Sequence, residues 1–153
     1  MGFSFNGLSE QMDKQKILAK VMIEVAGTPQ EHIDQTVKLL AEQIAKEAGV
    51  KVVKQKIGET IVVKIDKITR DMFSSFVELE MWFDNLESMS QLMFMYYPSH
   101  VEIIEPHSLT IPSDEVSEMY TTLAAKLHHL DSFVKKLKAQ VAMLATELKK
   151  FKE

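Results

Sequence analysis

Four glutamates are the residues whose types and spacing could support metal chemistry. Glu78 and Glu80 alternate with apolar residues in a strand-like segment, and Glu24 and Glu102 occur in two further segments of that kind. Since side chains two residues apart lie on the same face of a strand, the four carboxylates would share one face of a sheet. Such a face could bind Mg²⁺. A solvated acidic face has the same pattern, and we adopt that interpretation, predicting neither a metal site nor a cofactor.

Four apolar residues would share this face with the glutamates. They are too apolar to lie bare, so we expect the face either to pair with a second sheet or to be covered by the N-terminal arm. The residues are Met22, Phe76, Trp82 and Ile104.

The segment Gly27-Thr28 could form a ligand loop. It precedes a predicted helix, and free backbone amides at a helix N-terminus attract anions. The alternative is a plain helix start, in which Thr28 is the N-cap, Pro29 the first helical residue and Glu31 the other half of a capping box.

The histidines do not complete a catalytic or metal site in the sequence. His100 and Glu102 would share a strand face, but two ligands are too few for a metal site. His128 and His129 fall at outward positions of a heptad repeat, where solvated histidine is the expected state. Since no nucleophile triad or phosphate-binding motif is found either, we predict no catalytic residue and a protein that is not an enzyme.

Periodicity predicts the elements that would position these residues. Alternating apolar residues predict strands. Helical spacing predicts two helices in this part of the chain. The first starts with a capping box of Thr28 and Glu31 and ends at Gly49, and the second starts with a capping box of Asp84 and Glu87 and ends before Pro98. Ile61–Val63 is a further strand-like stretch, and residues 66–71 are predicted to be a polar connection. The four main strands are predicted at 17–25, 50–57, 73–83 and 101–104.

The order strand, helix, strand, strand, helix, strand predicts an α+β fold. Right-handed crossovers would place both helices on one face of a four-stranded antiparallel sheet, which is the ferredoxin-like arrangement. We expect an N-terminal arm at 1–16, this domain at 17–112 and a long C-terminal coiled-coil helix at 113–153.

A seven-residue apolar repeat dominates the C-terminal segment and predicts a coiled-coil seam. Tyr and Leu occupy some a positions and β-branched Val the others, whereas Leu fills most d positions. β-Branched residues at a with Leu at d favour a coiled coil of two parallel helices. The predicted oligomer interface consists of Val116, Tyr120, Leu123, Leu127, Leu130, Val134, Leu137, Val141, Leu144, Leu148 and Phe151.

Charges beside the seam agree with a parallel homodimer. Lys126 at position g would face Asp131 at position e of a second copy, and Glu147 and Lys152 repeat this relation. The alternative is that the stripe packs on the chain's own domain. A basic-zipper DNA-binding protein is excluded, because the residues before the repeat are not a run of Lys and Arg.

The composition limits the classes of partner. A net charge of −4 and 26% charged residues argue against a nucleic-acid surface and an anionic membrane. The absence of cysteine excludes disulfides and thiolate sites, and no long apolar run or signal-peptide pattern is found, so we expect a soluble cytoplasmic protein.

Three resemblances bear on function. The placement of the Gly27-Thr28-Pro29 loop in residues 19–105 resembles ACT domains, which would imply a small-molecule sensor, although the usual Pro-Gly step is absent. The stretch from Tyr96 to Pro106 looks like the closing segment of small uncharacterised archaeal proteins. Residues 72–79 resemble the aromatic strand of RNA-recognition motifs, but the basic residue and the glycine of that strand are replaced here by Met72 and Phe73.

Three functions follow from these observations. The first is a non-enzymatic, homodimeric interaction or assembly protein held together by the coiled coil. The second is an ACT-like small-molecule sensor, and the third is a metal-dependent enzyme that uses the acidic sheet face. Sequence favours the first.

Overall fold

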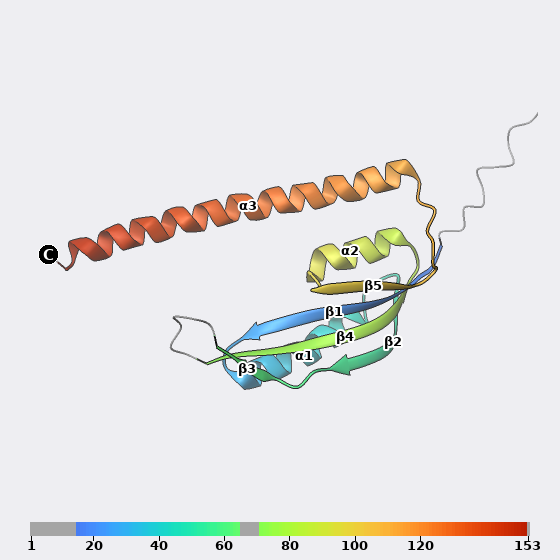
Figure 1. The fold of residues 1–153 in the computed structure, drawn as a ribbon, viewed down its shortest axis with the longest axis horizontal. Coiled ribbons are helices and arrows are strands. Elements are labelled where there is room, and N and C mark those ends of the chain that lie inside the picture. Colours follow the sequence, from blue (N-terminus) through green and yellow to red (C-terminus); the bar gives the residue numbers. More distant parts are fainter. Residues whose placement is uncertain (1–14, 65–70, 153) are drawn as a thin grey trace, which may run out of the picture. The chain divides into compact units, whose positions relative to one another are not determined.

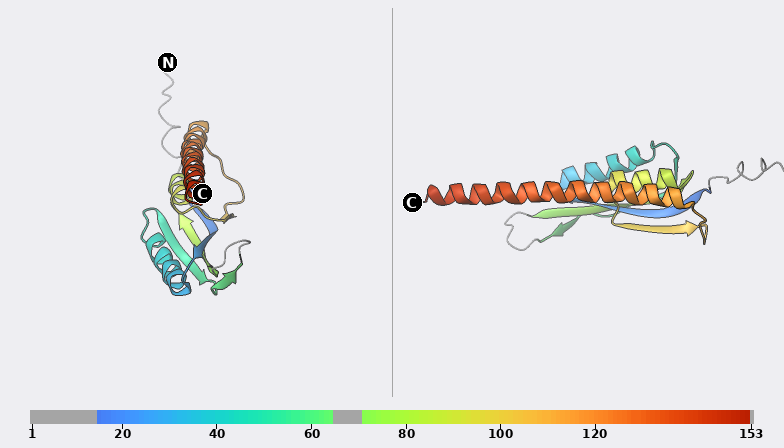
Figure 2. Two further views of the ribbon diagram at one scale, coloured as in Figure 1. Left: turned by 90° about the vertical axis from the view of Figure 1, so that its left-hand side faces the viewer. Right: turned by 90° about the horizontal axis from the view of Figure 1, so that it is seen from above.

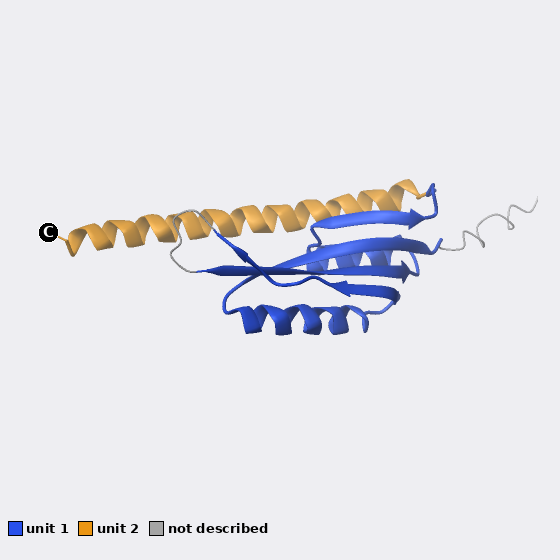
Figure 3. Cartoon of the chain, turned by 60° about the horizontal axis from the view of Figure 1, so that its bottom comes forward, with its two compact units in different colours: residues 1–110 blue, residues 111–153 orange. Residues whose placement is uncertain are grey.

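The computed structural model describes residues 15–64 and 71–152. The chain divides into two compact units, residues 1–110 and residues 111–153 (Figure 3). We call the first unit the head and describe the two units separately. The predicted N-terminal arm and the predicted polar connection at 66–71 lie almost entirely outside the described residues.

The head is an α+β unit built on one antiparallel sheet (Figure 1). The strand order is β2-β4-β1-β5, and the short β3 also pairs with β4. Four main strands were predicted and the sheet has five, because the further strand-like stretch Ile61–Val63 forms β3 after a break at residues 58–60. The strands are β1 (Ile17–Gly27), β2 (Val50–Ile57), β3 (Ile61–Val63), β4 (Met72–Phe83) and β5 (His100–Glu105).

Gly58 marks the interruption between β2 and β3. Its N–H donates to the carbonyl of Phe76 at 2.8 Å, and its own carbonyl accepts from the hydroxyl of Ser75 at 2.8 Å. A Cβ at position 58 would lie 2.2 Å from the ring of Phe76. Since that ring fills the space of a side chain, only glycine fits here without displacement.

The core lies on the sheet face covered by helices α1 (Gln30–Ile44) and α2 (Leu86–Tyr96) (Figure 2). Every second residue is buried there from Ile17 to Ile23 in β1 and from Val77 to Phe83 in β4, as the alternation predicted. One apolar cluster joins these residues to four positions of α1 and two of α2. Its members are Ile17, Ala19, Val21, Ile23, Ile33, Val37, Ala41, Ile44, Val77, Leu79, Met81, Phe83, Met89 and Leu92.

The start of α1 differs from the prediction. Pro29 is the N-cap residue, and no side chain caps the helix, so the predicted capping box of Thr28 and Glu31 is wrong. The carbonyl of Pro29 accepts from His32 N at 3.1 Å and from Ile33 N at 3.4 Å. The helix therefore begins one residue later than predicted.

The end of α1 also differs from the prediction. The helix ends at Ile44, and the turn that follows contains bonds from Lys46 N to Gln43 O and from Glu47 N to Ile44 O, three residues apart. Gly49 lies after this turn with φ +72°, a left-handed conformation that favours glycine. Its carbonyl accepts from Asp84 N at 3.0 Å.

A capping box starts α2 one residue later than the predicted box of Asp84 and Glu87. The side chain of Asn85 accepts from Ser88 N at 2.9 Å, and the hydroxyl of Ser88 accepts from Asn85 N at 3.3 Å. Tyr97 ends the helix with φ 50°, and Pro98 follows as predicted.

The second unit consists mainly of α3 (Ser113–Lys150), a helix of 38 residues. At 1.5 Å per residue it is about 57 Å long. Asp114 and Glu115 lie in its first turn and Lys149 and Lys150 in its last, and both pairs complement the helix dipole. Residues 106–112 connect β5 to this helix and are bounded by two prolines.

Candidate functional site

The apolar surface of α3 is the candidate functional site. The described part of the helix contains no buried residue, although its heptad positions are apolar over the whole length. Of the predicted interface residues, Val116 and Leu123 are half-buried. The others are exposed, and they are Tyr120, Leu127, Leu130, Val134, Leu137, Val141, Leu144, Leu148 and Phe151.

This exposure is unusual for a single helix in water. Large apolar side chains lose roughly 1.5–3 kcal/mol of stabilisation when they are left in solvent rather than fully buried. From Leu127 to the end of α3, exposed residues of this kind recur at every turn, so they form one continuous stripe and not a scatter of single positions. The stripe can bind an apolar surface of matching length.

The sides of the stripe carry both charged and apolar residues. Asp131 forms an ion pair with Lys135 within the helix at 2.6 Å, so its carboxylate already has a cation one turn away. Phe133 and Met143 are exposed by 54% and 65% and lie outside the a and d positions. Phe133 at position g borders the seam and widens the apolar surface, whereas Met143 at position c lies away from it.

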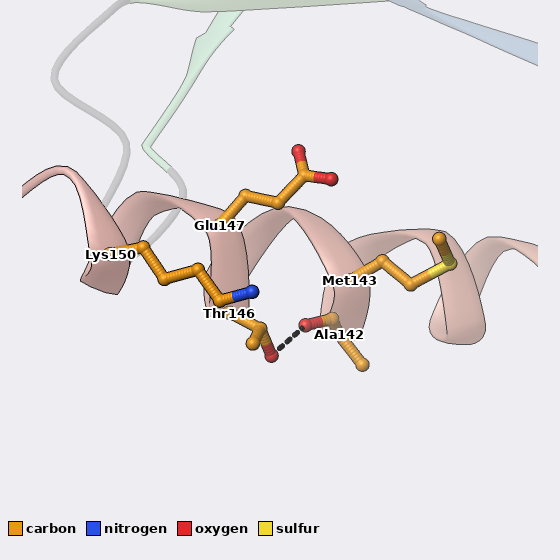
Figure 4. A pocket seen from close by; sticks show the side chains of 5 residues that line it. All are labelled: Ala142, Met143, Thr146, Glu147 and Lys150. Atoms are coloured by element: carbon orange, nitrogen blue, oxygen red, sulfur yellow. Dashed lines mark hydrogen bonds between the residues drawn. The ribbon is translucent and has the colours of Figure 1, made fainter.

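A shallow hollow lies near the end of α3 (Figure 4). All its lining residues belong to two turns of the same helix, and the hydroxyl of Thr146 donates to the carbonyl of Ala142 at 3.0 Å. Since one helix cannot enclose a ligand, we assign no binding role to this hollow. Its remaining lining residues are Met143, Glu147 and Lys150.

The sheet face opposite the helices, here called the open face, is not the acidic surface that the sequence predicted. Cross-strand pairing sets Lys54 beside Glu80, Glu80 beside Lys20, and Lys20 beside Glu102. This row therefore alternates in sign across all four long strands. The Nζ atom of Lys54 lies 3.2 Å from both carboxylate oxygens of Glu80.

Two further lysines lie on the open face. Lys56 pairs with Glu78 and Lys51 with Trp82 in the β2–β4 register. The prediction of a carboxylate cluster is wrong because these lysines stand between or beside the carboxylates. In residues 15–64 and 71–152, no group of three metal-ligating side chains is found.

The apolar residues of the open face are only partly exposed in the single chain. Met22, Phe76, Trp82 and Ile104 are all half-buried, and the ring of Phe76 lies against Gly58. Cover of this face by a second sheet or by the N-terminal arm stays a prediction.

The predicted ligand loop, Gly27-Thr28, lies where β1 connects to α1. Gly27 pairs with Phe73 in the sheet, and a Cβ on it would lie 3.2 Å from Cδ1 of Ile33. Thr28 is exposed and makes no side-chain cap. A role of this loop in ligand binding stays a prediction.

The histidines are exposed and separate. His100 pairs with Met22 across the β1–β5 ladder, and His107 lies in the connection beyond β5. His128 and His129 lie on the outward side of α3 and are exposed, as the heptad register predicted.

One polar contact of the head was not predicted. The hydroxyl of Tyr96, at the end of α2, donates to the carboxylate of Glu47 in the turn after α1. This hydrogen bond, with burial and the negative charge as further causes, raises the pKa of Tyr96 from its ordinary value of 10.0 to about 12. The contact joins the ends of the two helices and is remote from α3 in sequence, so we assign it a structural role.

A family model matches residues 18–153, which cover the head and α3 together. The chain belongs to the MJ0538 family. The matched residues of this chain include the heptad repeat as well as the strands of the sheet from residue 18 onward. No curated protein matches the chain, and no solved structure does.

Within the described part of this MJ0538-family chain, no helix has both the length and the apolar character needed to cross a membrane.

Proposed function

We propose that this protein is a non-enzymatic interaction or assembly protein that associates with itself through a parallel coiled coil of α3. The observation that carries the proposal is the exposed stripe on a 38-residue helix without a buried residue. A second copy supplies an apolar surface of the same length and the same seven-residue spacing.

Charge supports the parallel orientation. Glu147 at position g and Lys152 at position e have opposite signs, and so do Lys126 and Asp131. In a parallel pair each g residue faces the e residue of the following heptad on the other chain. Exposed pairs of this kind contribute about 0.2–1 kcal/mol each, so they select orientation more than they stabilise.

The first experiment is the molar mass of the whole chain by sedimentation equilibrium over a wide range of concentration. We expect a dimer that dissociates on dilution. A monomer at all concentrations would show that α3 does not bind a second copy, and the proposal would then be wrong.

The orientation can be tested by disulfide crosslinking, because the chain contains no cysteine. Leu144→Cys places a thiol at a d position, where two parallel helices bring equivalent Cα atoms within disulfide range. We expect this variant to form a crosslinked dimer alone under oxidation. In an antiparallel coil the crosslink would instead need a mixture with a variant such as Leu123→Cys.

We also propose that the head has the ferredoxin-like arrangement. The order β2-β4-β1-β5, with α1 between β1 and β2 and α2 between β4 and β5, supports it. β3 pairs with residues Met72–Ser74 of β4, on the edge opposite β1, so it continues the line of β2. The sheet then corresponds to four strands with one interrupted edge. A crystal structure of the whole chain would test this assignment.

The two alternative functions lack such support. The open face has alternating charge in place of a carboxylate cluster, and the Gly27-Thr28 loop contains no charged group for a metabolite. We keep the cytoplasm as the proposed compartment, which cell fractionation would test.

A further inference from the structure

The two edges of the head sheet differ in charge on the open face. At the β2 edge, Lys51, Lys54 and Lys56 lie on this face, as their pairing with residues of β4 shows. At the β5 edge, Glu102 and Glu105 lie on it, opposite Lys20 and Leu18. All five of these edge residues are exposed. One edge is therefore basic and the other acidic.

The same edges expose apolar residues on the opposite face of the sheet. Val101 and Ile103 of β5 pair with buried residues of β1, yet they are exposed by 37% and 42%. On β2, Ile57 pairs with buried Val77 and is exposed by 37%, and Val52 pairs with buried Met81 and is half-buried. Each edge thus combines an apolar side with a charged side.

The directions of the strands permit the two edges to pair. Neighbouring strands are antiparallel throughout the order β2-β4-β1-β5, so β2 and β5 run in opposite directions. A second copy in the same orientation, placed beside the first, would set its β5 antiparallel to β2. In the described part of the chain, no strand pairs with the outer edge of either strand.

We propose that heads associate edge to edge, with β5 of one copy adding to β2 of the next. Lysines would then face glutamates on the open face, and apolar residues would meet on the other face. Pairing of two β2 edges would oppose lysine to lysine, and pairing of two β5 edges would oppose glutamate to glutamate; both are unfavourable. Because the paired surfaces differ, the contact can repeat and form rings or open chains of heads.

This inference goes beyond the proposed function, because the contact lies in the head and not in α3. The test uses the full chain with Leu130→Lys and Leu137→Lys, which disrupt the α3 seam so that only the head contact affects molar mass. Two charge-reversed forms are made in this background. The β2 form has Lys51→Glu and Lys56→Glu, and the β5 form has Glu102→Lys and Glu105→Lys. Lys54 is kept because of its ion pair with Glu80.

We expect the molar mass of the unreversed chain to rise with concentration and to fall when salt is added, because exposed charges are screened. Either reversed form alone should reach the same molar mass only at a protein concentration at least about tenfold higher, because two attractive cross-strand pairs become repulsive. A mixture of the two forms should regain the original assembly, since every lysine edge then meets a glutamate edge.

The control is Lys38→Glu with Lys46→Glu, the same change of charge on exposed residues of α1 and the turn after it. It should leave the assembly unchanged. A molar mass independent of concentration in the unreversed chain would overturn the proposal. So would reversed forms that assemble like the parent. A mixture that does not regain assembly, when circular dichroism shows both forms to be folded, would also overturn it, because complementary edges would then be present without association.

Discussion

Replacement of one leucine in the α3 seam should weaken self-association by a measurable amount. Leu137 is exposed by 43% in the single chain, so a second copy would cover about two-fifths of its surface. Full burial of a leucine contributes roughly 1.5–3 kcal/mol, which gives about 1–2.5 kcal/mol for the two leucines of a dimer. Leu137→Ala should therefore raise the dissociation constant of the dimer by about 5- to 70-fold.

Sedimentation equilibrium at several concentrations measures this constant directly. Alanine favours helix at least as strongly as leucine, so α3 should stay helical, which circular dichroism would check. Any loss of affinity would then come from the missing contact between helices.

Two matched variants test whether the seam is responsible. Met143→Ala removes an exposed apolar residue of α3 that lies outside the a and d positions, and Leu39→Ala removes one from α1 of the head. Both should change affinity much less than Leu137→Ala. Equal effects of Met143→Ala and Leu137→Ala would refute the heptad register, and no effect of Leu137→Ala would refute the coiled coil.

Three predictions concern the head. Gly49→Ala should lower the free energy of unfolding by at least about 1–2 kcal/mol in urea titrations, because φ is +72° there; an unchanged midpoint would contradict this conformation. Gly58→Ala should cost about 1–3 kcal/mol, since its Cβ would lie 2.2 Å from the ring of Phe76, and Phe76→Leu in the same chain should restore part of the loss. The pKa of Tyr96 is raised in the folded chain, so folding favours the neutral phenol. The contribution of Tyr96 to the free energy of unfolding is therefore complete below pH 10 and is lost as pH rises through about 12. With the other tyrosines replaced by Phe, ultraviolet titration should show a lower pKa for Tyr96 after Glu47→Gln, and an unchanged value would argue against the hydrogen bond.

The periodicity of apolar residues within a single stretch of sequence predicted most of the helices and strands well. The alternation in β4 gave its length to within one residue, and helical spacing identified α1, α2 and α3. The ends of the helices were less predictable. Asp84 and Asn85 are both good N-cap residues. In the structure Asp84 N donates to the carbonyl of Gly49, in a contact between distant segments, and the side chain of Asn85 caps the helix.

Patterns that depend on pairing between segments could not be predicted in the same way. The open face was expected to be acidic because the strand with Glu78 and Glu80 was considered without its neighbour. Lys54 and Lys56 have the period of two that could have indicated their place, but Lys51 does not fit it, because the register shifts near Val53. Which residue of β2 faces which carboxylate follows only from the ladder of hydrogen bonds.

The proline-bounded connection of residues 106–112 has a consequence for any ligand of the head. Seven residues span at most about 25 Å, so dimerisation through α3 would tether two heads close to the same end of one rod. Tethering of this kind gives an effective local concentration in the millimolar range. A ligand with two epitopes would then rebind before it could diffuse away, and avidity would turn a weak contact of one head into a long-lived complex.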